Sequence, residues 1–455
     1  MTTLGEYAKV QGGFAYKSKD FIGASEYRVL KIKNVRFGTI DYSEPAFVPK
    51  NIAESTINWK LKEGDILISM TGSGPNAPQS LVGRVARVWK NEPDAWFNQR
   101  VGRINLVDNK KIHPDFLFYW LSLPQNQDFL VSNSSGSANQ ANISGKTIES
   151  LPTPIVDYEI SSAIAKIARE LDEKIILNTQ TNQTLEQIAQ AIFKSWFVDF
   201  EPVKAKIETL ASGGSADDAE LAAISVISAK TLDELNSLKA SNPEAFNKLA
   251  QTAALFPTAM QDSELGEIPK GWSYCTFGDI SACFDSKRVP LSKRKREEKQ
   301  PGTIPYYGAT SVMDYVNEWI FDDTYLLLGE DGSVVKDDGT PFVQYIWGKS
   351  WVNNHAHVLQ GNNGVSTEHL MVFIKGTNIG SYVTGAVQLK LNQKNMNSIP
   401  FLKASTEINL VFQGILNGLY DAYKNNIESS QSLSSLRDSL LPRLLSGEIE
   451  LKDKE

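Results

Sequence analysis

The sequence predicts an α+β fold in which two mixed α/β domains are separated by two long antiparallel helices that form a coiled coil, with an internal pseudo-twofold repeat. The first observation is that a shift of 248 residues places residues 143–197 over residues 391–445 without a gap. The second is that apolar residues in both segments recur at helical spacing. The third is that short alternating runs bounded by Gly, Pro and Asn precede each segment, as is typical of strands.

This repeat divides the chain into four predicted regions. Residues 1–150 and 265–400 are the two variable domains, and residues 151–264 and 401–455 are the helical regions that follow them. An acidic helical insertion at 205–267, most of it within the first helical region, is expected to extend the first long helix. The formal net charge of −7 lies mainly in the helical regions and the insertion, so a duplex could approach the variable domains without facing all of it.

Each long segment predicts one helix of about 40 residues, or roughly 60 Å, longer than a domain of this size is wide. A narrow apolar stripe of that length needs a partner, and the second copy can supply it. The alternative is two unrelated surface helices, each packed on its own domain. The residues predicted to pair the helices match across the repeat: Ile164, Ile167 and Leu171 with Phe412, Ile415 and Leu419.

The variable domains contain several short apolar runs, which predict strands at residues 27–35, 65–70, 83–89 and 101–107, and again at 325–329, 341–347, 357–361 and 370–376. FLFYWLSL (116–123) predicts a short helix within this mostly β context. Each variable domain therefore has several strands joined by long polar loops.

Motifs for catalysis are absent from the sequence. It has no G-x-x-x-x-G-K-[ST] phosphate loop, no NPPF or DPPY tetrapeptide and no glycine-rich turn for a nucleoside cofactor. His355 and His357 could begin a metal site, but a polar strand face explains them better. We therefore expect a chain that is not an enzyme and holds no cofactor or metal. Two cysteines, no signal peptide and no apolar run of membrane length predict a cytoplasmic protein.

Polar and basic residues on glycine-containing loops are the candidates for binding double-stranded DNA, because Arg and Lys read guanine, Asn and Gln read adenine, and Ser and Lys hold phosphates. The candidates of the first domain are Lys17, Lys19, Ser73, Asn76, Asn98, Gln99, Arg100 and Asn139. Those of the second are Lys287, Arg288, Lys293, Arg294, Tyr306, Tyr307, Ser333, Asn354, His355 and Lys390.

Several motifs together resemble the specificity subunits of type I restriction–modification enzymes. They are LGEIPKGW (265–272), LLPRLLSGEI (440–449), SWFVDFEPV (195–203), and SGSANQANIS (135–144) leading into LPTPIV (151–156). The resemblance covers nearly the whole chain, although the variable domains carry no diagnostic signature. KSWF (194–197) stands where the second copy has PRLL (442–445), so the helix ends differ.

The resemblance implies that each variable domain is a target-recognition domain for one half of a bipartite DNA site, and that the helices act as a ruler for the spacer. It also implies two modification subunits, which carry S-adenosylmethionine, and two restriction subunits, which use ATP and Mg²⁺. Two other classes stay open: a DNA-binding regulator without a methyltransferase partner, and a coiled-coil scaffold with protein-binding modules.

Overall fold

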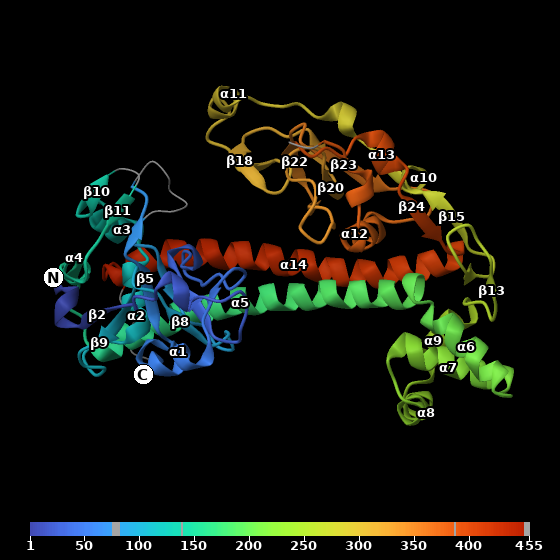
Figure 1. The fold of residues 1–455 in the computed structure, drawn as a ribbon, viewed down its shortest axis with the longest axis horizontal. Helices are drawn as coiled ribbons and strands as arrows, with labels where there is room; N and C mark the ends of the chain where they lie inside the picture. The colour runs from blue at the N-terminus through green and yellow to red at the C-terminus, as the bar shows by residue number, and fades with distance from the viewer. Residues whose placement is uncertain (75–81, 138–139, 386–387, 450–455) are drawn as a thin grey trace. The chain divides into compact units, whose positions relative to one another are not determined.

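A computed structural model describes residues 1–74, 82–137, 140–385 and 388–449. The chain divides into two compact units, one formed by Met1–Asn178 with Glu428–Glu455 and the other by Thr179–Ile427. Each unit contains one variable domain and one part of each long helix (Figure 1). Among the described residues, no helix combines the length and apolar character that crossing a bilayer requires.

The variable domain of the first unit is built on an antiparallel four-stranded sheet in the order β2-β9-β5-β7. A second sheet has the order β4-β3-β8, with β3 and β8 parallel, and a third has the order β10-β11-β6. The strands are β2 (Ala8–Gly12), β3 (Arg28–Leu30), β4 (Ala46–Phe47), β5 (Ile66–Ser69), β6 (Thr71–Gly72), β7 (Val85–Arg87), β8 (Ala95–Phe97), β9 (Val101–Leu106), β10 (Ser135–Ser137) and β11 (Gln140–Asn142). The helices are α1 (Lys50–Ser55), α2 (Pro114–Leu121), α3 (Pro124–Ser132) and α4 (Gly145–Glu149).

The variable domain of the second unit repeats this topology. Its antiparallel sheet has the order β16-β23-β20-β21, and its other sheet has the order β18-β17-β22-β19, with β17 and β22 parallel. The strands are β16 (Ser281–Cys283), β17 (Ile304–Tyr307), β18 (Val312–Val316), β19 (Phe321–Asp322), β20 (Tyr325–Gly329), β21 (Val343–Ile346), β22 (Lys349–Val352) and β23 (Ala356–Gly361). The helices are α10 (Phe277–Ile280), α11 (Lys293–Glu297), α12 (Thr367–Gly376) and α13 (Gln393–Asn397). The predicted repeat of mixed α/β domains is confirmed.

Both domains also close on themselves. β1 (Thr2–Thr3) pairs with β12 (Pro152–Thr153), just before the first long helix. In the second copy, β15 (Ser273–Thr276) pairs with β24 (Pro400–Lys403), just before the second long helix. Each domain therefore begins and ends in one short antiparallel ladder.

The two long helices are α5 (Tyr158–Phe193) and α14 (Thr406–Leu445), and they pair antiparallel within each unit. In the first unit, Arg437 Nη1 donates to Asp172 at 2.5 Å, and Asn178 Nδ2 donates to Ser430 Oγ at 3.1 Å. In the second unit, Asn426 Nδ2 donates to Asn182 Oδ1 at 2.8 Å. As the residue number rises along α5, the number of the residue that it contacts on α14 falls, which is the pattern of an antiparallel pair.

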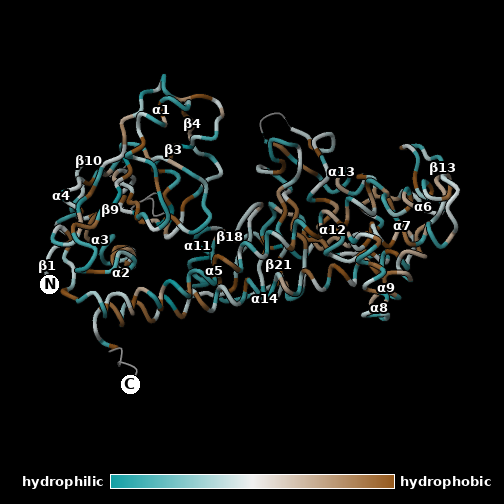
Figure 2. Tube along the Cα trace, turned by 90° about the horizontal axis from the view of Figure 1, so that it is seen from below, coloured by the Kyte–Doolittle hydropathy of each residue, from teal (hydrophilic) through white to brown (hydrophobic). Residues whose placement is uncertain are grey.

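The contacts between the helices combine apolar ends with a polar middle. Ile164 is buried in the core of the first domain, and Phe412 is buried with its ring 4.9 Å from that of Phe197. The other predicted pairing residues, Ile167, Leu171, Ile415 and Leu419, are half-buried. In Figure 2, hydrophobic and hydrophilic residues follow one another at short intervals along α14. The asparagine contacts of the middle were not predicted.

The prediction of a strand at residues 370–376 is wrong, because these residues lie in α12. The Ser366 side chain accepts the His369 N–H at the start of this helix. Leu370, Met371, Val372 and Ile374 are all buried in the second domain's core. A short apolar run that is buried on all sides has no periodicity to distinguish a helix from a strand.

The expected extension of the first helix by the insertion is also wrong. After α5 a π-helical turn covers Lys194–Val198, and Phe200 then takes a left-handed conformation with φ of 56° that redirects the chain. The insertion forms separate helices with a small core of their own. They are α6 (Glu201–Ala211), α7 (Ala216–Ser228), α8 (Leu232–Ser241) and α9 (Pro243–Ala254), followed by the pair β13 (Met260–Gln261) and β14 (Ile268–Pro269).

Candidate nucleic-acid interface

Three loop segments of the first domain lie side by side, and we call them the first loop cluster. They are the turn Asn98–Arg100 between β8 and β9, the segment Met70–Ser73 after β5, and the hairpin formed by β10 and β11. The Met70 N–H donates to the Arg100 carbonyl at 2.9 Å, and the Ile143 N–H donates to the Met70 carbonyl at 2.9 Å. These bonds join the turn and the hairpin through the segment between them.

The second domain has an equivalent second loop cluster. It consists of the turn Asn353–His355 between β22 and β23, the segment Glu330–Ser333 after β20, and a hairpin whose ends, Thr384 and Lys390, pair. The Glu330 N–H donates to the His355 carbonyl at 2.9 Å, and the Leu391 N–H donates to the Glu330 carbonyl at 2.8 Å. The same two backbone bonds therefore hold both clusters.

This cluster brings together four of the six candidates that lie in the described part of the first domain. Gln99 and Arg100 are exposed on the turn, and Asn98 and Ser73 are half-buried beside it. Lys17 and Lys19 are exposed on a neighbouring loop that the Phe14–Asn98 bridge joins to the turn. Asn76 and Asn139 lie outside the described residues.

The second loop cluster likewise brings together Ser333, Asn354, His355 and Lys390. Ser333, Asn354 and Lys390 are exposed, and the half-buried His355 ring bonds to the Asp331 carboxylate. Tyr307 lies next to the turn, because its carbonyl accepts the Asn353 N–H.

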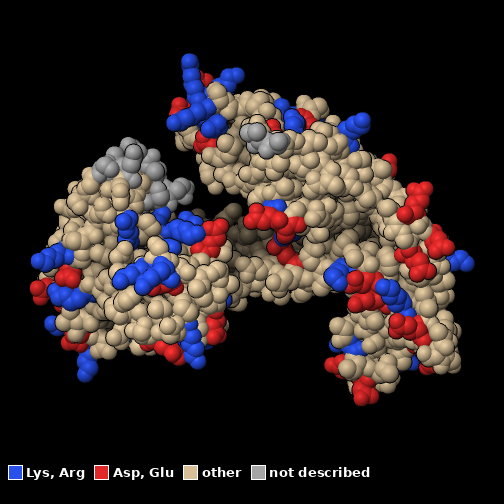
Figure 3. Space-filling model, viewed as in Figure 1, with Lys and Arg blue, Asp and Glu red and all other residues tan. Residues whose placement is uncertain are grey.

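Basic candidates also gather on α11, where Lys and Arg side chains project in Figure 3. Lys293 and Arg294 have side chains 84% and 88% exposed. Arg296 of the same helix is instead held by Asp314, with 2.8 Å between Nε and the carboxylate. The helix therefore presents two exposed cations, each paired with a glutamate four residues further on, from a base that Arg296 anchors.

Two candidates are enclosed in the second domain and one is exposed near them. Tyr306 is 1% exposed, and its hydroxyl accepts the Leu291 N–H at 2.9 Å. The Arg288 side chain is 12% exposed and bonds to Asp285, Glu330 and the Ala356 carbonyl. Lys287 is exposed, with its ammonium 4.9 Å from the centre of the Phe284 ring.

The base of the first loop cluster is apolar. A Cβ at Gly102 would lie 2.9 Å from the Val10 side chain and 3.1 Å from the Met70 sulfur. Both Val10 and Met70 pack against the core of the domain. Glycine at 102 is therefore required by close packing under this cluster.

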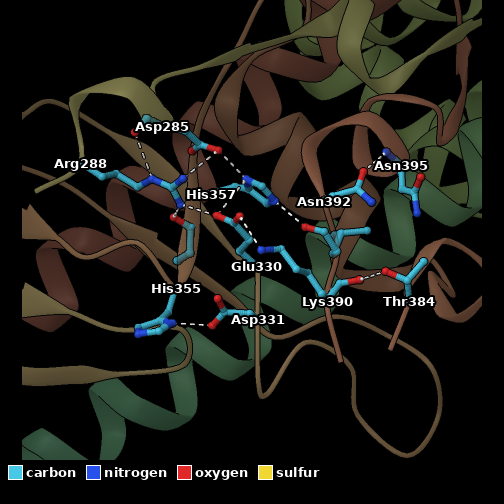
Figure 4. Close-up of polar contacts among 12 residues, drawn as sticks. Asp285, Arg288, Glu330, Asp331, His355, His357, Thr384, Lys390, Asn392 and Asn395 are labelled. Carbon is cyan, nitrogen blue, oxygen red and sulfur yellow. Dashed lines mark hydrogen bonds and ion pairs between the residues drawn. The ribbon is translucent and has the colours of Figure 1, made fainter. Parts of the chain in front are cut away.

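The base of the second loop cluster is ionic (Figure 4). His357, which takes the place of Gly102, is 1% exposed and bonds to Asp285 at 2.5 Å and to the Leu391 carbonyl at 2.8 Å. Arg288 Nη1 lies 2.7 Å from Glu330. Burial opposes the charged form of His357, but its bonds to Asp285, Cys283 and the Leu391 carbonyl outweigh this and raise its pKa to about 10.

A metal could in principle use Cys283, Asp285 and His357, whose ligand atoms lie within 4.8 Å of one another. Both ring nitrogens of His357 already have partners, and the cationic Arg288 contacts Asp285 at 3.3 Å. A protonated imidazole fits these contacts better than a metal ligand does. His355 bonds to Asp331 instead, so the two histidines do not converge.

Sequence reasoning singled out the loops of both clusters, including the loop that contains Glu330, but missed Met70 and Asp285 beneath them. It interpreted His357 as part of a polar strand face, whereas the structure buries this residue among ion pairs. An alignment of residues 98–102 with 353–357 would have placed His357 over Gly102. Different loop lengths place that match at an offset of 255 residues rather than 248, which hides it in a comparison at one offset.

The type I restriction modification DNA specificity domain matches residues 1–187 and 269–408. The HindI specificity subunit of Haemophilus influenzae is 32% identical over 358 residues, which cover 74% of this chain and 77% of that protein. The MjaIX specificity subunit of Methanocaldococcus jannaschii is 20% identical over 89% of this chain and 83% of its own. A solved S subunit from M. genitalium is 16% identical, with a TM-score of 0.48, over 99% of this chain and 96% of that one.

Two domains of one topology, each with the same loop cluster, define a duplicated recognition protein. The chain belongs to the type I restriction–modification specificity family, and its role is accordingly the recognition of DNA sequence.

Proposed function

We propose that this chain is the DNA-recognition subunit of a type I restriction–modification complex and that it reads a bipartite site. Each loop cluster would enter the major groove at one half-site, and α5 and α14 would set the spacer between them. The observation that carries the proposal is the repeated pair of backbone bonds that builds the same cluster in both domains. Residues 1–150 and 265–400 would act as the target-recognition domains, joined by the helical regions 151–264 and 401–455.

Within this proposal, exposed Gln99, Arg100 and Asn354 are the best placed to meet base edges. The exposed lysines 17, 19 and 293 are better suited to phosphates, because flexible ammonium groups hold charge without reading bases. Tyr306 and Arg288 would support the domain from within.

The same proposal assigns the chemistry to partners. Two modification subunits would supply S-adenosylmethionine and methyl transfer, and two restriction subunits would supply ATP- and Mg²⁺-dependent cleavage, all docked on this cytoplasmic chain. The chain itself would contribute only binding and geometry.

Methylation mapping tests the proposal directly. In cells that express this chain with its methyltransferase partner, we expect methylated adenines within a motif of two specific parts around a fixed nonspecific spacer. Purified chain mixed with S-adenosylmethionine and varied DNA should transfer no methyl groups. A continuous motif, or transfer by the chain alone, would contradict the proposal.

A further inference from the structure

The two loop clusters have the same backbone hydrogen bonds, but the side chains beneath them differ in chemistry. In the first, the side chains beneath the cluster are Val10 and Met70, against Gly102. In the second, the equivalent positions hold Cys283, Glu330 and His357. Aliphatic and thioether contacts act without direction, whereas ion pairs and hydrogen bonds fix donor and acceptor positions.

The ionic base is tied directly to the hairpin of the second cluster. His357 Nε2 bonds to the Leu391 carbonyl at 2.8 Å, and Lys390 Nζ lies 3.8 Å from Glu330. The Glu330 carbonyl accepts the Leu391 N–H, and the Gly332 N–H donates to the Leu389 carbonyl at 3.0 Å. The hairpin end is therefore held by the backbone of Glu330 and Gly332 and by the side chains of Glu330 and His357 (Figure 4).

Glu330 and Arg288 are themselves enclosed. Their side chains are 16% and 12% exposed, and Arg288 Nη1 also donates to the Ala356 carbonyl at 2.6 Å. A guanidinium that already holds Asp285, Glu330 and a carbonyl would have to give up these bonds to contact a base. These groups are therefore placed to position neighbouring residues rather than to touch DNA.

We infer that Glu330, held by Arg288 and beside His357, is a positioning residue that sets Lys390 and Leu391 at the end of the hairpin and thereby the discrimination of one half-site. In the first domain the equivalent residue, Met70, carries no charge and packs against the core. This inference rests on the proposed function for its effect on DNA. Its structural part does not, because the position of the hairpin can be measured without DNA.

Hydrogen exchange of the full-length chain tests the structural part. Glu330→Gln keeps the size of the side chain but removes the charge that Arg288 and Lys390 face. We expect protection of the Lys390 and Leu391 amides to fall about tenfold, while amides of β20, β23 and the first domain keep theirs. Glu318→Gln is the matched control, because it removes a carboxylate that pairs with Lys299 elsewhere in the same domain.

Discrimination by the complex with its methyltransferase tests the functional part. We expect Glu330→Gln to reduce, by about tenfold, the preference for an intact over an altered second half-site, the scale of one lost base-pair contact. Preference at the other half-site should not change. Arg288→Lys keeps the positive charge but not all the bonds of the guanidinium, so its loss should be smaller.

The outcomes separate the two proposals. If the wild-type complex recognises no bipartite site, the proposed function fails, and the exchange result still decides whether Glu330 sets the hairpin. Unchanged exchange at the hairpin would overturn the inference. Increased exchange throughout β20 and β23 would also overturn it, because the network would then hold the whole domain. An equal loss of preference at both half-sites would also overturn the inference, because the effect of Glu330 would then not be confined to one half-site.

Discussion

Arg100 and His355 occupy the same place in the two loop clusters, since the carbonyl of each accepts the equivalent backbone N–H. The Arg100 side chain is exposed and can offer two parallel donors, whereas the His355 ring is already bonded to Asp331. If the loop clusters face DNA as proposed, the same backbone position therefore presents different chemistry to it in the two domains.

Arg100→Ala should weaken binding to the intact site by about 1–3 kcal/mol and relax the preference at one base position. Lys19→Ala should instead weaken binding to all sequences alike. It should also reduce the steepness of the plot of log binding constant against log salt concentration by about one. Titrations of the complex on single-base variants, at two or more salt concentrations, distinguish these results. A uniform loss for Arg100→Ala would make it a phosphate contact.

His357 should make the stability of the chain depend on alkaline pH. Its pKa is raised to about 10 in the folded chain and is about 6.5 when unfolded. Its contribution is therefore complete below pH 6.5 and is lost as pH rises through 10. Bonds from His357 lower the pKa of Asp285 despite its burial, so that carboxylate stays charged throughout this window.

Thermal unfolding at pH 7 and pH 9.5 should show a fall in stability of a few kcal/mol, most of which His357→Gln removes. His369→Phe is the control: complete burial lowers the pKa of His369 to about 3, so its effect lies at acid pH. If His357→Gln left the alkaline fall unchanged, another group would be responsible.

At the scale of elements, α5 and α14 could be predicted from sequence because helical periodicity survives over many turns. The middle of their interface could not, because Asn178, Asn182 and Asn426 look like ordinary surface residues until a partner helix is placed beside them. The bond from Asn178 to Ser430 and the bond from Asn426 to Asn182 are related by the 248-residue shift. Polar pairs of this kind fix which residues face each other, since any other register separates them.

A double-mutant cycle on Asn182 and Asn426 measures this coupling. Each substitution by Ala should cost about 1–3 kcal/mol, and the pair should couple by roughly 0.5–3 kcal/mol. Urea unfolding of the four proteins provides the values. The exposed pair Glu244–Lys248 should couple by about 0.5 kcal/mol or less. Equal coupling in both cycles would mean that the asparagines do not define the register.

The length of the helices should set the spacer. Duplicating Asn178–Thr181 in α5 and Asn426–Ser429 in α14 adds about one turn, or 6 Å, to each helix and leaves asparagines near the same face. We expect the methylated motif to keep both half-sites and to gain one or two base pairs of spacer, since one base pair spans about 3.4 Å.

Two-residue insertions at the same points are the control, because they rotate the packed faces by about half a turn and should impair assembly. An unchanged spacer after the four-residue duplications would mean that α5 and α14 do not act as the ruler.

At the scale of the whole molecule, the repeat predicted two domains of one kind, and the matching sheet orders confirm it. The sequence comparison detected the copies best near the long helices. Within the domains, loops of unequal length change the sequence offset between the copies. The equivalence of Met70 and Glu330 is therefore apparent only from the sheets, because Met70 follows β5 and Glu330 follows the corresponding strand, β20.

Exchange of residues 1–145 for those of a relative should change one half of the methylated motif and leave the other half and the spacer intact, because each domain has its own core and loop cluster. Methylation mapping of the chimera gives the result. If both halves changed, the domains would not be independent readers.

The short ladders that close each domain also bear on how such genes can change. Thr2 faces Thr153, and Thr276 faces Pro400, so the two ends of each domain lie side by side. A recombination event with crossovers at these points would replace a complete domain without stretching the polypeptide on either side. If each domain reads one half-site as proposed, new combinations of half-sites could then arise in single steps from existing genes, with no intermediate that must fold around a mismatched join.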